Sequence, residues 1–123
     1  MQPDSPRHAG QAAEQQALDH LQRHGLQLLH RNWLCKGGEL DLVMLDGDTV
    51  VFVEVRYRLH AQWGGALGSI DARKRLRVVN AAQWFLQREI RWQNAPCRFD
   101  VIALEGSASP SRKVHWLPNA FEC

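Results

Sequence analysis

The hydrophobic pattern along the chain switches between two periods, and each stretch of constant period predicts one element. Apolar residues three to four positions apart predict two helices, over residues 9–24 and from residue 69 or 71 to residue 89. Alternating or short apolar runs between turn residues predict five strands, over residues 26–33, 39–45, 49–57, 99–104 and 113–117. The predicted order is α-β-β-β-α-β-β. This order indicates an α/β fold with a mixed central sheet flanked by helices.

The two strands in the middle of the chain are joined by Asp46 and Gly47, a strong signal for a two-residue hairpin turn. The length of this loop decides which residues of the two strands face each other. A loop of two residues places Asp41 opposite Phe52, whereas a loop of four residues places Asp41 directly opposite Glu54. Both alternatives bring the two carboxylates onto one face of the hairpin.

Four charged residues occupy strand positions that would ordinarily be apolar, namely Glu39, Asp41, Glu54 and Arg56. The reverse face is predicted to form a continuous core surface with Leu40, Leu42, Met44, Val51, Val53 and Val55. Like charges opposite each other destabilise a sheet, so the carboxylates require a partner. Mg²⁺ or Mn²⁺ is the simplest partner, because both ions prefer oxygen ligands. The alternative is a solvated face on which Arg56 pairs with a carboxylate.

Each predicted helix carries one charged residue on or beside its apolar side. Glu14 precedes Leu18 by four residues and therefore lies on or beside the buried stripe of the first helix. Lys74 projects into the apolar arc of the second helix, between Ala81 and Phe85. Either side chain can extend along the edge of the core into solvent. The functional alternative directs Glu14 at the hairpin carboxylates and makes Lys74 a catalytic cation.

The second helix is predicted to bury one ridge and to present a basic stripe on its other side. The ridge is formed by Leu76, Val79, Ala82 and Leu86. The basic stripe combines cations with an aromatic ring, as nucleic-acid surfaces do, and consists of Arg73, Arg77, Trp84 and Arg88. A solvated face is the alternative. Arg58 begins a glycine-rich segment, residues 58–68, which could admit a phosphate backbone but lacks a nucleotide-binding fingerprint.

The length of 123 residues fits one domain, residues 9–123, after a disordered tail at residues 1–8. The net charge of +2 does not indicate any class of partner. No long apolar run or signal pattern is present, so we expect no membrane span and a cytoplasmic location. Three widely separated cysteines predict neither disulfides nor a zinc site. Asp100 is expected at the start of its strand, bonded to turn amides, in preference to a role behind the metal ligands.

Several segments together resemble one family of small bacterial proteins, the YraN family. They are the helix with Gly10 and Glu14, RNW at residues 31–33, GGELDLVMLDGDTVVFVEVRYR at 37–58, SIDARKR at 69–75 and RFDVI at 98–102. The family has no assigned function but belongs to the restriction-endonuclease-like PD-(D/E)xK superfamily, in which Holliday-junction resolvases are similar members. Sites of this superfamily carry an Asp, followed by a strand with the pattern (Asp/Glu)-x-Lys.

The resemblance implies that Asp41 is the metal-binding Asp, that Glu54 is the acidic member of the strand motif and that Glu14 matches the helix glutamate of resolvases. It also implies that Arg56 occupies the Lys position. Arginine supplies charge and hydrogen bonds but stays protonated, so Arg56 cannot act as a general base. Lys74 could supply a second cation.

These observations lead to one main hypothesis, a Mg²⁺- or Mn²⁺-dependent nuclease acting on DNA, with branched or damaged DNA among its candidate substrates. Its predicted metal ligands are Glu14, Glu39, Asp41 and Glu54, and its predicted catalytic residues are Asp41, Glu54, Arg56 and Lys74. Nucleic acid is expected to contact Arg58, Arg73, Arg77, Trp84 and Arg88. The alternatives are a non-catalytic nucleic-acid-binding protein of the same fold and a scaffold protein. The oligomeric state is left open, with a homodimer among the options.

Overall fold

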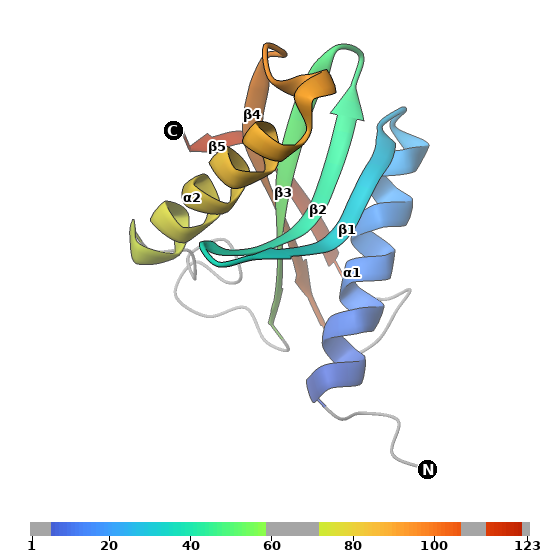
Figure 1. Ribbon diagram of the computed structural model, residues 1–123. Coiled ribbons are helices and arrows are strands. Elements are labelled where there is room, and N and C mark those ends of the chain that lie inside the picture. Colours follow the sequence, from blue (N-terminus) through green and yellow to red (C-terminus); the bar gives the residue numbers. More distant parts are fainter. Residues whose placement is uncertain (1–5, 59–71, 107–112, 122–123) are drawn as a thin grey trace.

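The computed structural model describes residues 6–58, 72–106 and 113–121 of the chain. A five-stranded sheet has the order β1-β2-β3-β4-β5, with helix α1 on one face and helix α2 on the other (Figure 1). Strands β3 and β4 are parallel, and the other neighbours are antiparallel. The elements are α1 (Pro6–Arg23), β1 (Gln27–Cys35), β2 (Gly38–Asp46), β3 (Thr49–Arg58), α2 (Ala72–Arg88), the 3₁₀ helix η2 (Ile90–Trp92), β4 (Cys97–Glu105) and β5 (Lys113–Phe121). The predicted α/β fold and the order α-β-β-β-α-β-β are confirmed.

Helix α1 begins at Pro6, earlier than the predicted start at Ala9. Residues 6–8, which were expected to belong to a disordered tail, are therefore helical, and proline is well tolerated in the first turn of a helix. Residues 1–5 of the expected tail and residues 59–68 of the glycine-rich segment lie outside the described residues. In the part of the chain that the structure describes, neither helix is long and apolar enough to cross a membrane.

Each helix covers one face of the sheet with its own apolar cluster. The cluster under α1 joins four helix residues to buried residues of β2, β3 and β4, among them Leu42, Met44, Val51, Val53 and Ile102. The cluster under α2 contains Val43, Val50, Phe52, Phe99 and Val101 from the opposite face of the same strands. Because β2, β3 and β4 are apolar on both faces, a charged residue within them requires a partner.

The buried side of α2 differs from the predicted ridge. The residues that the helix buries are Val78, Ala81, Ala82 and Phe85, whereas Leu76 of the predicted ridge is 61% exposed. Phe85 determines this orientation, because its ring packs edge-on against Phe52 and Trp33, with centroids 5.8 and 5.4 Å apart. Lys74 stands four residues before Val78 and is therefore at the N-terminal end of the buried stripe.

The β2–β3 hairpin has the register in which Asp41 lies opposite Glu54. The paired residues run from Asp46↔Thr49 to Leu42↔Val53, and continuing this register by one position would place Asp41 opposite Glu54. The turn residues are Gly47 and Asp48, one position later than the predicted Asp46 and Gly47. Gly47 takes a positive φ of 64°, as glycine readily does at the first turn position. The strands therefore have the register that was predicted for a four-residue loop, although the turn itself contains only two residues.

Strand β2 loses its regular alternation at Asp41. Leu40 packs in the cluster under α2, whereas Leu42 packs in the cluster under α1. The prediction that Leu40 and Leu42 share one apolar face is therefore wrong. The ladder with β3 ends at Leu42, and the Val55 N–H donates to Asp41 Oδ2 at 2.9 Å in place of a backbone carbonyl. Asp41 thus lies where β2 separates from β3.

The glycine pair before this point brings the β1–β2 turn against α2. A Cβ atom on Gly37 would lie only 3.1 Å from Trp84 Cδ1, and one on Gly38 would lie 3.4 Å from the Arg77 carbonyl oxygen. Gly38 also has a positive φ of 143°. The close approach of the turn sets the distance between the start of β2 and α2, and with it the width of the space between Glu39 and α2.

Asp100 lies inside β4, not at its start as predicted, and it is fully buried. Its carboxylate accepts hydrogen bonds from the side chains of Arg98 and Trp116 and from the backbone N–H of Asn119. Strand β5 also continues beyond the predicted stop at Pro118, because a proline is tolerated in an edge strand. These contacts make Asp100 a structural residue that joins β4 to β5.

Candidate metal and nucleic-acid site

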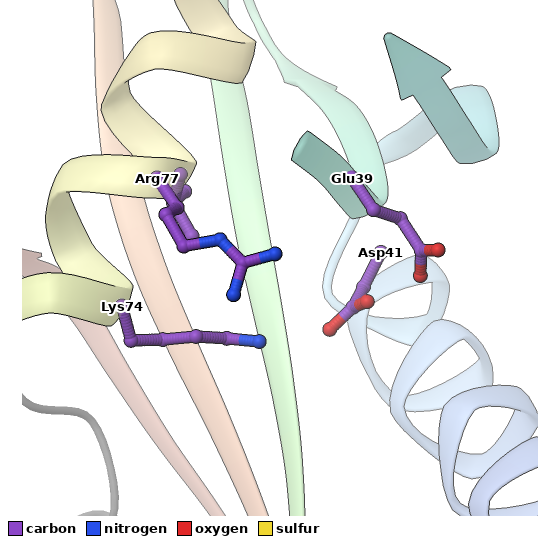
Figure 2. Close-up of a pocket in the computed structure, with 5 residues that line it drawn as sticks. Glu39, Asp41, Lys74 and Arg77 are labelled. Atoms are coloured by element: carbon purple, nitrogen blue, oxygen red, sulfur yellow. The ribbon is translucent and has the colours of Figure 1, made fainter. Parts of the chain in front are cut away.

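A pocket of about 200 Å³ lies between the start of β2 and the first turns of α2. It is lined by Glu39, Asp41, Lys74, Arg77 and Val78. Figure 2 shows the two carboxylates of β2 facing the two cations of α2 across this space. The volume is below the 300–1,000 Å³ of a typical drug-sized ligand site, and it suits a small charged group.

Glu54 is paired with Lys74 of the pocket wall, and the Glu54 side chain is almost completely withdrawn from water. The residue is 2% exposed, and the Lys74 Nζ lies 3.2 Å from Glu54 Oε1. Glu54 Oε2 is buried and has no hydrogen-bond partner among the described residues. Burial raises the pKa of Glu54, and the positive charge of Lys74 opposes this rise. Lys74 thus satisfies one of the two carboxylate oxygens and leaves the other unsatisfied.

Asp41 is half-buried and lies beside Glu54. Burial and the negative charge of Glu54 raise the pKa of Asp41 from 3.8 to about 8, although the hydrogen bond from Val55 lowers it. The negative charges of Glu14 and Glu39 add smaller contributions in the same direction as burial. Two adjacent carboxyls that both resist ionisation indicate a place where a cation would be stabilised, because a positive charge would favour both ionised forms.

Glu14 reaches the sheet from α1, and its side chain is 14% exposed. Its Oε1 accepts hydrogen bonds from Arg31 Nε at 2.9 Å and from Asn32 Nδ2 at 3.0 Å. Glu14 therefore does not extend into solvent but is held against β1. Sequence reasoning did not identify Arg31 and Asn32 as site residues. Their only signal was their place in the RNW segment on which the family resemblance partly rests.

The predicted metal ligands occupy one region but do not form a ready-made cage. Within residues 6–58, 72–106 and 113–121, no three acidic, histidine or cysteine side chains converge tightly enough to hold a metal ion. Asp41 and Glu54 lie together, whereas Glu39 is exposed at the pocket wall and Glu14 is bonded to β1. Mg²⁺ usually takes one or two protein carboxylates and completes its shell with water and phosphate oxygens. The pair of Asp41 and Glu54 fits this donor set, with the unsatisfied Glu54 Oε2 as a vacant acceptor.

The predicted basic stripe of α2 divides into two parts. Arg73 is exposed, and Arg77 lines the pocket. Trp84 packs against Gly37 and lies under the Arg88 guanidinium, 5.7 Å from the ring centroid, so its ring already has two packing partners. The predicted stripe therefore presents cations, whereas Trp84 mainly packs against the β1–β2 turn. Arg58 is the last residue of β3, and its side chain lies outside the described part of the chain.

The raised pKa of Asp41 predicts that the metal-free protein loses stability as the pH rises. The folded state binds the Asp41 proton more tightly than the unfolded chain, so the free energy of unfolding should fall between about pH 4 and pH 8. Asp41→Asn should make this fall shallower, because it removes the titrating group and keeps an oxygen for the Val55 N–H. Thermal and urea melts in EDTA at several pH values measure the slope. Asp48→Asn, in the exposed turn, should retain the wild-type slope, and an unchanged slope in Asp41→Asn would contradict the assignment.

Comparison with known proteins identifies the family of the chain. The sequence profile described as "Uncharacterised protein family UPF0102" matches residues 13–104. A UPF0102 protein of Pseudomonas putida F1 is 71% identical over 119 residues, which is 97% of each chain. UPF0102 proteins of Pseudomonas fluorescens Pf-5 and Pseudomonas syringae pv. syringae B728a are 66% and 58% identical, over 96% and 99% of each chain. The chain therefore belongs to the UPF0102 family, as its resemblance to the YraN proteins predicts.

Proposed function

We propose that the protein is a cytoplasmic nuclease that uses Mg²⁺ or Mn²⁺ to hydrolyse phosphodiester bonds of DNA, with branched or damaged DNA among its substrates. The observation that carries this proposal is the buried, unsatisfied Glu54 Oε2 beside Asp41, at the edge of a pocket that also contains two cations. An unsatisfied buried carboxylate oxygen destabilises a fold, so its retention indicates a bound partner.

Asp41 and Glu54 are the residues that would hold the divalent ion, and Glu39 and Glu14 lie nearby. A bound ion would polarise the scissile phosphate and lower the pKa of a water molecule that serves as the nucleophile. The chain's own groups would position the substrate. Because Asp41 tends to remain protonated without a cation, binding of the ion should release a proton from the pair.

The cations in and beside the pocket suit a phosphodiester. Lys74 and Arg77 project from α2 toward the two carboxylates of β2, as Figure 2 shows. Arg56 lies two residues after Glu54 on β3, and its charge acts on Glu54. Arginine donates hydrogen bonds to phosphate oxygens in a fixed geometry, whereas lysine contributes a compact charge. Carboxylates, cations and a small pocket together favour a substrate whose reacting group is a phosphate.

A non-catalytic nucleic-acid-binding protein is the second candidate, and one observation favours it. The strand position that carries Lys in active members of the superfamily pattern holds Arg56 here. Lys74, which pairs with Glu54, comes from a different element, helix α2. If this arrangement orients no water, the site retains phosphate and metal binding without cleavage. Cleavage assays on linear, flapped and four-way DNA with Mg²⁺ and Mn²⁺ separate the two candidates.

The first prediction under this proposal concerns the metal ion. Calorimetric titration with Mn²⁺ should show one site in the wild-type protein. The double variant Asp41→Asn, Glu54→Gln keeps the side-chain shapes but removes both charges, and it should lose more than about 100-fold in affinity, above the loss typical of an outer-shell residue. The control is Asp48→Asn, which removes an exposed carboxylate of the neighbouring turn. Equal heats for the double variant and the wild type would exclude this metal site.

The second prediction concerns Arg56, which we expect to stabilise negative charge on the phosphate. Arg56→Lys should retain cleavage, whereas Arg56→Ala should lower the cleavage rate by roughly 10²–10³, as loss of one transition-state donor does. If Arg56 only neutralises Glu54, Arg56→Ala should lower the melting temperature without metal, and Mg²⁺ should restore it. Full cleavage by folded Arg56→Ala would contradict the catalytic role.

The third prediction concerns the basic side of α2. Replacing Arg73, Arg77 and Arg88 with Ala should weaken DNA binding, because each cation that neutralises a phosphate releases counterions. Each lost phosphate contact should flatten the slope of log affinity against log salt by about one. Fluorescence anisotropy at several salt concentrations measures both quantities. Arg23→Ala, at the exposed end of α1, is the control, and a triple variant with the wild-type slope would place the DNA elsewhere.

A further inference from the structure

Asn32 has a backbone conformation that is unusual within a strand. Its φ of 53° lies in the left-handed region, which among the non-glycine residues of the described ranges only Asn119 shares. Asparagine tolerates this region better than most residues, but single residues held there are typical of constrained functional sites. In a regular strand, Arg31 and Asn32 would point to opposite faces of the sheet. The left-handed conformation removes this alternation, and both side chains reach α1.

The two side chains converge on a single oxygen atom. Arg31 Nε and Asn32 Nδ2 both donate to Glu14 Oε1, and Arg31 also donates through a second nitrogen to Gln15 Oε1 at 2.7 Å. Hydrogen bonds to an ionised carboxylate are roughly twice as strong as those between neutral groups. The contacts therefore fix the orientation of the Glu14 carboxylate. Both hydrogen bonds end at Glu14 Oε1, so Glu14 Oε2 accepts neither of them.

The strand register places this clamp beside the proposed site. Arg31 pairs with Leu42 and Trp33 pairs with Leu40, so Asn32 lies directly across from Asp41. Asp41 in turn lies beside Glu54 at the point where the β2–β3 ladder ends, and its Oδ2 accepts a hydrogen bond from the Val55 N–H. Opposed residues on antiparallel strands have Cα atoms about 4.5–5.5 Å apart. Asn32, Asp41 and Glu54 thus form a row across three strands, and Asn32 holds Glu14 at one end of it.

The geometry points to Asn32 as a positioning residue that holds the Glu14 carboxylate beside Asp41, so that the negative charge of Glu14 strengthens the binding of a divalent ion by Asp41 and Glu54. This inference rests on the proposed function. Residues that lie behind the metal ligands tune a metal site, and their loss commonly lowers metal affinity about 10- to 100-fold. The left-handed conformation of Asn32 brings its side-chain amide to the side of the sheet on which Glu14 lies. The competing interpretation is that the clamp only fastens α1 to β1.

Asn32→Gly separates these interpretations, because glycine adopts the left-handed conformation without strain and lacks the amide. We expect its Mn²⁺ affinity, measured by calorimetry, to fall about 10- to 100-fold. Glu14→Gln should lose affinity to at least the same extent. The matched control is Asn119→Gly, which alters the other left-handed asparagine, at φ 52° in β5. The control should bind Mn²⁺ as the wild type does, and the metal-free melting temperature shows what each glycine does to the fold.

Two outcomes would overturn the inference, and only the second would also overturn the proposed function. If Mn²⁺ binding requires Asp41 but Asn32→Gly and Glu14→Gln bind as tightly as the wild type, the clamp only fastens α1 and the proposed function stands. If the wild type shows no Asp41-dependent binding, the proposed function fails and this inference fails with it. Should Asn32→Gly not fold, wild-type Mn²⁺ affinity in Glu14→Gln still overturns the inference, because this variant keeps an oxygen for the two donors and removes the charge.

Discussion

Two carboxyl groups, Asp41 and Glu54, lie across from each other on neighbouring strands at a point where little water reaches them, and the rest of the site depends on this constraint. Two negative charges in such a place repel each other and lose hydration. Two contacts reduce this penalty, the Lys74 ammonium at Glu54 Oε1 and the Val55 amide at Asp41 Oδ2, and the penalty that remains raises the pKa of Asp41. They leave Glu54 Oε2 unsatisfied. A fold selected for stability alone would place apolar residues here, as both strands do at their other buried positions.

The surrounding elements open the sheet at this point. Beyond Leu42, β2 no longer pairs with β3, and the β1–β2 turn instead packs against α2 through Gly37 and Trp84. A Cβ atom on Gly37 would lie 3.1 Å from the Trp84 ring, so a larger residue would require that ring to move by a few tenths of an ångström. The space between the separating strands and α2 is where Glu39, Asp41, Lys74 and Arg77 meet. The same break in pairing frees the Val55 amide to bind Asp41, so the strand separation and the environment of the carboxylate have one structural cause.

Local patterns predicted the strands of the hairpin, the order of the elements and the presence of Lys74 on the buried side of its helix. They could not choose the hairpin register, because the loop signal at Asp46 and Gly47 is compatible with two offsets, and the offset alone decides whether Asp41 meets Glu54. The buried stripe of α2 was misassigned because several periodic ridges compete, and the packing of Phe85 on Phe52 and Trp33 selects one. Leu40 and Asn32 depart from strand alternation, and a period-two rule cannot predict such departures.

The lysine that pairs with Glu54 lies on a helix and not on the strand that carries Glu54. In the (Asp/Glu)-x-Lys pattern that the sequence resembles, the lysine lies two residues after the acidic residue of the same strand, so the backbone itself fixes the distance between them. Here Lys74 approaches Glu54 from α2, and its position depends on the packing of Val78, Ala81 and Phe85 onto the sheet. The neutralisation of Glu54 by Lys74 therefore depends on how helix α2 packs onto the sheet. Because the β1–β2 turn rests on the same helix through Trp84, movement of α2 would shift the cations and the start of β2 together. The site is thus assembled by tertiary packing between elements, and the stability of the α2 interface determines how well its charges are aligned.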